Sequence, residues 1–487
     1  MRIRVVRGWN KTADTNYLFL FAAVQACSVF PNRLRRLFLL SSGIVKDFPL
    51  SRPDHVPKYI FMNIAPSPDS ANTIPDPIAA AREIGLSLLK PSQRDLDYGL
   101  ALHRESLVVE SYGLGLHAPV RPDVLNKAFS DGASPIEFQD LLEEMIMTGW
   151  ATEDRLREEY RTAWETSGVT CMFLNAGEES NDPLRLLNRL SRYVALTDAL
   201  PDILERAVTV EGIRAAHAKG KRVLCLSGNG VPLTGNTFTA QDELRYLQVF
   251  SNLGIRMMHL TYNRRNLLAD GCAEPDNAGL SDFGRMAIRE MNRLGILVDV
   301  AHSGWKTCVE AAKVSSQPIV ISHSAMWELN QHARCKPDEV IRAVVDGGGT
   351  MGITNVPAFL GGGGDLPTLL DHVDCAVRKF GHEAVTIGID SAYVSRWSEQ
   401  AAQALLPRPT QRPRWENFWP PDDAIRLPQW NQPHQHQSMT STNWPLITVG
   451  LVQRGHSDEA VRHIIGENML RVAGQVWNPP ASSPWPQ

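Results

Sequence analysis

The sequence predicts an α/β fold, a (β/α)8 TIM barrel, beginning near residue 105. Short apolar runs typical of buried strands alternate with segments of helical periodicity, and there are eight such runs. Nearly continuous apolar strands indicate a parallel sheet covered on both faces. Eight strand–helix units favour a closed barrel, and an open doubly wound sheet is the alternative. The runs are residues 107–111, 168–174, 221–227, 256–262, 296–302, 318–323, 350–355 and 384–390.

The segments between the runs carry the helical signals. In residues 242–254, apolar side chains recur on one helical face: Leu244, Leu247, Phe250 and Leu253. Residues 280–295 have Ser281 as a predicted N-cap and Gly295 as a predicted C-terminal cap. Their predicted apolar stripe comprises Phe283, Met286, Ala287 and Leu294. Residues 457–472 are expected to form an amphipathic helix that starts at Ser457 and closes the barrel.

Polar residues at the ends of the runs are the candidate functional residues, because catalysis in a (β/α)8 barrel takes place at the carboxyl ends of the strands. His302 and His323 end consecutive runs and are expected to converge on one pocket. Two neutral imidazoles with Asp390, from the last run, would form a shell for a divalent metal. His259 lies inside the fourth run and is interpreted as a core histidine.

The chain is expected to comprise two parts. Residues 1–78 form an N-terminal extension, disordered or signal-like, and residues 79–487 form a single barrel domain with an insertion loop at 396–446. The apolar run Tyr17–Phe30 is too short to span a bilayer, so no stable membrane span is expected. A soluble cytoplasmic protein is the primary expectation, and an export signal at Tyr17–Phe30 is the alternative.

Composition narrows the function classes. A net charge of −4 over 487 residues gives no reason to expect a nucleic-acid partner. The seven cysteines are scattered and form no CxxC motif, which favours reduced buried thiols over a disulfide framework or a thiolate zinc site. The HQH tract at 434–436 lies in a loop rich in proline and glutamine and is interpreted as structural or solvated.

The stretch GLSDFGRMAIREMNRLGILVDVAHSG, followed by PIVISHSA and ARCKPDEV, resembles the membrane (renal) dipeptidase family, the M19 metallopeptidases. The resemblance implies a (β/α)8 barrel of the amidohydrolase type, two zinc ions and hydrolysis of dipeptides. It assigns His302 and His323 to the second zinc site, Arg334 to binding of the substrate carboxylate, and Asp390 to a position beside the catalytic water.

Four positions depart from the family pattern, so the first zinc site is not expected to form. Tyr112 and Leu114 replace the histidine and aspartate of the first strand, and Ser227 replaces the bridging glutamate. Tyr262 replaces the histidine that polarises the scissile carbonyl, and it is interpreted as a pocket-lining or catalytic residue. Glu110, Glu178 and Glu179 are candidates for a compensating ligand.

The sequence therefore predicts a metallohydrolase that cleaves dipeptides or similar small carboxylated amides. We expect one zinc ion rather than two, with manganese as an alternative, and a homodimer is a further expectation. Two other hypotheses stay open: a pseudoenzyme that binds a small carboxylated ligand, and an amidohydrolase acting on a non-peptide amide or lactone.

Overall fold

The computed structural model describes residues 76–177, 182–235, 239–407 and 418–477. Its centre is a parallel sheet in which eight strands follow one another in chain order. Every predicted apolar run contains or overlaps one of these strands. They are β1 (Val108–Gly113), β3 (Val169–Asn175), β5 (Arg222–Gly228), β6 (Ile255–His259), β7 (Leu297–Asp299), β8 (Val320–Ser324), β9 (Thr350–Ile353) and β10 (Val385–Ile387).

The barrel closes just after the last strand. The backbone N–H of Asp390 donates to the carbonyl of Tyr112 at 3.2 Å, and Ser391 accepts from the N–H of Leu114 at 3.4 Å. The end of β10 is therefore joined to β1, which confirms the predicted (β/α)8 barrel and excludes an open doubly wound sheet. Three short strands are additional: β4 (Leu204–Arg206), which pairs with β5, and β2 (Leu116–His117), which pairs with β11 (Tyr393–Val394).

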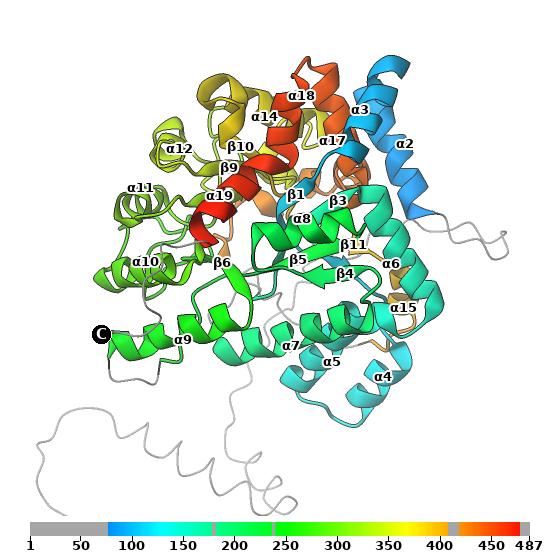
Figure 1. Ribbon diagram of the computed structural model, residues 1–487. Helices are drawn as coiled ribbons and strands as arrows, with labels where there is room; N and C mark the ends of the chain where they lie inside the picture. Colours follow the sequence, from blue (N-terminus) through cyan, green and yellow to red (C-terminus); the bar gives the residue numbers. More distant parts are fainter. Residues whose placement is uncertain (1–75, 178–181, 236–238, 408–417, 478–487) are drawn as a thin grey trace, which may run out of the picture. The chain divides into compact units, whose positions relative to one another are not determined.

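Helices surround the strands (Figure 1). Those between β1 and β7 are α4 (Pro122–Ser130), α5 (Pro135–Thr148), α6 (Asp154–Ser167), α7 (Pro183–Ala199), α8 (Val210–Ala218), α9 (Ala240–Asn252) and α10 (Asp282–Leu294). The later ones are α11 (Trp305–Val314), α12 (Asp338–Val345), α13 (Pro357–Leu360), α14 (Leu366–Phe380), α15 (Ser398–Gln403), α16 (Pro433–Ser438), α17 (Trp444–Gln453), α18 (Asp458–Arg462) and α19 (Asn468–Trp477). Two helices precede the barrel, α2 (Pro77–Leu89) and α3 (Gln93–Glu105).

Helix α10 begins and ends where its sequence predicts. The Ser281 hydroxyl accepts from the N–H of Gly284 at 3.0 Å, and Gly295 closes the helix at φ 67°. The fully buried apolar face differs from the predicted stripe. It consists of Ala287, Ile288 and Met291, whereas Phe283, Met286 and Leu294 are only partly buried at its margins.

The C-terminal helical segment closes the amino end of the barrel. The helix predicted over 457–472 consists of α18, a π-helical turn at His463–Glu467, and α19. Apolar side chains of α19, including Met469 and Val472, share a buried cluster with barrel residues such as Val109 and Phe173. Figure 1 shows α19 crossing in front of the strands.

Two further expectations concern the cysteines and membrane spans. Six cysteines lie in the described part of the chain, and all six are buried free thiols as expected, whereas Cys27 lies outside it. Tyr17–Phe30 also lies outside the described residues. Among the helices that the structure describes, none combines the length and the apolar character that a bilayer crossing requires.

Candidate metal centre

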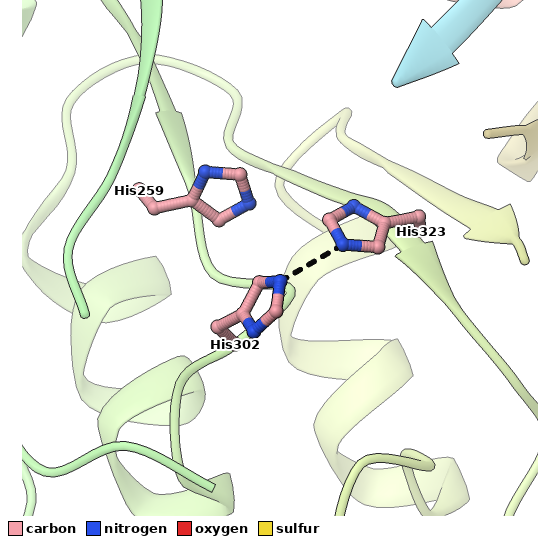
Figure 2. A group of neighbouring side chains, drawn as sticks. All are labelled: His259, His302 and His323. Carbon is pink, nitrogen blue, oxygen red and sulfur yellow. Dashed lines mark hydrogen bonds between the residues drawn. The ribbon is translucent and has the colours of Figure 1, made fainter. Parts of the chain in front are cut away.

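Three histidines meet at the carboxyl ends of neighbouring strands (Figure 2). His259 ends β6, His302 follows β7 and His323 lies in β8. One ligand atom of each lies within 4.8 Å of the others, and the Nε2 atoms of His302 and His323 are 3.0 Å apart. Zinc–nitrogen bonds of about 2.0–2.1 Å in tetrahedral geometry place two ligand nitrogens about 3.3 Å apart. The observed spacing is close to that value.

The remaining ring nitrogens of His302 and His323 have polar partners. Nδ1 of His302 lies 2.7 Å from Oδ1 of Asn263, and Nδ1 of His323 lies 2.7 Å from the hydroxyl of Ser322. Such partners typically orient metal-binding histidines. Burial, with the positive charge of Arg334 as the next cause, lowers the pKa of both rings well below 6.5. Both imidazoles are therefore neutral at pH 7 and keep the lone pair that a metal needs.

Asp299 supplies negative charge next to His259. Its Oδ2 atom lies 3.0 Å from Nε2 of His259, and its Oδ1 atom accepts from the backbone N–H groups of Ala301 and Ser322. Burial alone would raise the pKa of Asp299, but the neighbouring His259 and these hydrogen bonds outweigh it and lower the pKa. A charged carboxylate beside the three imidazole rings offsets part of the charge of a divalent cation. The donor set therefore fits one such ion.

Asp390 lies at the edge of the histidine cluster. Its Oδ2 atom is 3.8 Å from Nε2 of His323, and its backbone is held at φ 54° by the closure of the barrel onto Tyr112. Burial raises the pKa of Asp390 to about 7, although the charges of Arg334 and His259 oppose this shift. Close to neutral pH, this carboxyl group exchanges a proton readily.

Arg334 is fully buried with an unpaired edge. Its Nη1 donates to the carbonyl of Ala301 at 2.5 Å, and its guanidinium lies 5.7 Å from the ring centroid of Phe359. Among the described residues, neither Nε nor Nη2 has a hydrogen-bond partner. These two N–H groups form one edge of the planar fork, whose geometry matches the two oxygens of a carboxylate. A buried cation with this edge unpaired suits an anionic ligand.

Aromatic rings cover two of the histidines. Tyr262 stacks on His302 with 4.2 Å between ring centroids, and Phe418 meets Tyr262 edge-on at 5.0 Å. Tyr112 stacks on His323 at 3.8 Å, and its hydroxyl donates to Oδ1 of Asn229 at 2.9 Å. Phe418 belongs to the segment 396–446, so part of that predicted insertion contacts the residues around the site.

The family model for membrane dipeptidase, peptidase family M19, matches residues 155–399, which is half of the chain. The chain belongs to the membrane dipeptidase family. Dipeptidase tcpJ of Claviceps purpurea (strain 20.1) is 26% identical over 306 residues, 62% of this chain and 61% of that protein. Dipeptidase verJ of Clonostachys rogersoniana is 30% identical over 229 residues, 46% of this chain and 49% of that protein. The chain thus matches half to three fifths of the length of these curated relatives.

Solved structures support the barrel fold. An amidohydrolase from Pseudomonas aeruginosa aligns with a TM-score of 0.56 at 22% identity, covering 78% of this chain and 99% of that one. The probable dipeptidase PvdM from the same organism aligns with a TM-score of 0.55 at 19% identity, covering 80% and 99%. At these identities the likeness concerns the fold.

The residues that differ from the membrane dipeptidase pattern make other contacts. Tyr112 covers His323, and Ser227 donates its hydroxyl hydrogen to the carbonyl of Leu174 at 2.9 Å. Glu110 is not part of the histidine group, and its Oε2 accepts from the indole N–H of Trp444 on α17. Burial raises the pKa of Glu110 to about 8, so it is protonated at pH 7. Glu178 and Glu179 lie outside the described residues.

The structure brings the predicted site residues together and adds one. His302, His323, Asp390 and Tyr262 lie in mutual contact or close proximity, and the charge of Arg334 acts on both histidines. His259 is buried, as a core histidine would be, but it also belongs to the metal-capable group. The alternation of side chains along β6 indicates from the sequence that His259 points to the inside of the barrel. His259 and the barrel-lining Met257 are two residues apart and share a face of β6.

Proposed function

We propose that this chain is a metal-dependent hydrolase that cleaves a dipeptide or a similar small amide with a free carboxylate. The observation that carries the proposal is the cluster of three buried histidines, two of them neutral at pH 7, near a buried arginine with an unpaired edge. Membership of the membrane dipeptidase family supports the same reaction class.

His259, His302 and His323 would hold one divalent ion, zinc or alternatively manganese. When bound, such an ion polarises the amide carbonyl and makes water more acidic. Tyr112, Leu114 and Ser227 stand where the family has three further ligands, and none of these side chains suits zinc. One ion is therefore proposed in place of two.

Arg334 would fix the substrate by its carboxylate. The unpaired Nε–Nη2 edge donates two parallel hydrogen bonds, and burial strengthens each of them because little water competes. Holding the carboxylate there orients the amide toward the histidine cluster, which lowers the entropic part of the barrier.

Asp390 would act as the proton carrier. It lies beside His323 and can accept a proton from the attacking water and deliver it to the leaving amine. Tyr262 and Phe418 form an apolar wall over His302, which limits the access of bulk water to the reacting groups.

The test is metal analysis coupled to a dipeptide panel. Protein purified without chelators should contain about one zinc or manganese ion per chain at this centre and hydrolyse at least one L,L-, L,D- or dehydro-dipeptide. His323→Ala and His259→Ala should each abolish hydrolysis and remove that ion. His434→Ala is the matched control, because it removes an exposed imidazole far along the sequence from the cluster.

Other outcomes point to other functions. Stabilisation by dipeptides without hydrolysis would replace the proposal with a carboxylate-binding pseudoenzyme, which the loss of the first zinc site favours. Hydrolysis of lactones or non-peptide amides alone would change the substrate class and keep the site.

A further inference from the structure

A second group of metal-capable side chains lies at the opposite end of the barrel. His382 lies three residues before the start of β10, Glu459 lies on α18 and His463 begins the π-helical turn. One ligand atom of each residue lies within 4.8 Å of the other two. The carboxyl end of β10 leads toward Asp390, whereas His382 precedes its amino end. The group is therefore separate from the histidines described above.

The tautomer of His463 is determined by Asn468. The Nδ2 atom of Asn468 donates to the carbonyls of His382 and Val385 at 2.7 and 2.8 Å, which fixes the orientation of its amide. Its Oδ1 atom must then accept, and it lies 3.0 Å from Nδ1 of His463. The hydrogen of the neutral His463 ring is consequently on Nδ1, which leaves the Nε2 lone pair available to a ligand. Metal-binding histidines typically have this arrangement.

The ring of His382 lies next to that of His463 and has an unsatisfied nitrogen. Its centroid lies 5.3 Å from that of His463, with the ring planes 78° apart. Its Nε2 atom is buried and has no hydrogen-bond partner among the described residues. Buried polar atoms are rarely left unpaired, because their desolvation is costly. A cation bound between the two rings would give the Nε2 atom of His382 a partner.

Glu459 completes the donor set. It is four residues before His463, is exposed, and supplies the negative charge that imidazole ligands lack. The π-helical turn that starts at His463 is a rare element that is frequent at functional sites. Two imidazoles, one carboxylate and a free position for water suit zinc.

We propose that His382, His463 and Glu459 form a zinc-binding site at the amino end of the barrel. The ion would join the start of β10 to the segment that carries α19. Since Met469 and Val472 of α19 pack in the buried barrel cluster, this link would stabilise the closure of the barrel. The inference does not depend on the proposed hydrolase function.

The test is a zinc titration of the full chain carrying His323→Ala, which removes the first centre. Competition with a chromophoric chelator should show one remaining Zn²⁺ per chain. Adding His463→Ala or His382→Ala should weaken its binding by about a hundredfold or more, since losing even an outer partner costs about 10–100-fold. His434→Ala in the same background is the control and should leave the affinity unchanged.

Glu459→Gln and the effect of zinc on Tm provide two further tests of the site. Glu459→Gln alters only an exposed side chain and should weaken zinc binding about tenfold or more, even if the histidine variants fail to fold. Zinc should also raise the Tm of the His323→Ala protein but leave that of Glu459→Gln in this background nearly unchanged at the same zinc concentration. Equal zinc affinity with and without Glu459→Gln, or no binding at submillimolar zinc, would overturn the site.

Discussion

Arg334→Lys tests the role of the buried guanidinium most directly. Lysine keeps the positive charge but replaces the planar fork with a single ammonium group. In the wild-type protein Nη1 is occupied by the carbonyl of Ala301, whereas Nε and Nη2 are free for a ligand. A substrate carboxylate would therefore gain two charge-assisted hydrogen bonds from arginine and one from lysine.

The expected magnitude follows from that difference of one bond. A hydrogen bond to a charged group contributes about 1.5–3 kcal/mol. At about 1.4 kcal/mol per factor of ten, Arg334→Lys should lower kcat/KM for a dipeptide about 10- to 100-fold. The assay compares a dipeptide with its C-terminal carboxamide, which has no carboxylate for the fork to bind.

The carboxamide is the internal control. Wild-type protein should hydrolyse it poorly, and Arg334→Lys should change that rate little. A urea unfolding curve of each protein checks that the substitution has not merely destabilised the barrel. Equal decreases in kcat/KM with both substrates, or no decrease with the dipeptide, would show that Arg334 does not bind a carboxylate.

Three further predictions concern stability. Burial lowers the pKa of His103 to about 4, against 6.5 for a free imidazole. The contribution of the buried neutral ring to the free energy of unfolding is therefore complete above pH 6.5. It is lost as the pH falls from 6.5 to 4, because the unfolded chain binds a proton there and the folded chain does not. In urea unfolding, the free energy of unfolding of the wild-type protein should fall by about 3 kcal/mol between pH 6.5 and pH 4, and that of His103→Gln should not. Parallel pH curves for the two proteins would contradict this prediction. Gly284→Ala should destabilise by about 1–3 kcal/mol despite the better helix propensity of alanine, because its Cβ would lie 2.2 Å from the carbonyl oxygen of Leu268. Unchanged thermal unfolding would refute that contact. Ser281→Ala should cost about 1 kcal/mol by removing the cap of α10, with Ser281→Thr as the conservative control.

Much of the fold was predictable because its signals are local. Eight apolar runs appear as eight strands, and the caps Ser281 and Gly295 bound α10 as predicted. The prediction of which face of α10 is buried was less accurate. It depends on which neighbours the helix meets, and those neighbours place Ile288 and Met291 inward.

The candidate site was only partly predictable. His302 and His323 were identifiable because each ends an apolar run, and parallel strands present their carboxyl ends on one face. His259 was interpreted as a core residue because it lies inside its apolar run, and the alternation that places it on the face of Met257 was not used. The hydrogen-bond partner of Glu110 could not be predicted either, since Trp444 is more than three hundred residues away in sequence.

The sequence by itself determined the barrel, its strand order and two of the three clustered histidines, since periodicity and chain order specify these features. Only the tertiary structure decided which nitrogen atoms face one another, which edge of Arg334 stays unpaired and where Tyr112 and Phe418 stack. Those outcomes depend on distances between residues far apart in the chain, and barrel closure sets these distances. The pairing of His382 with His463 has the same origin, because it requires the C-terminal helices to dock beside the start of β10.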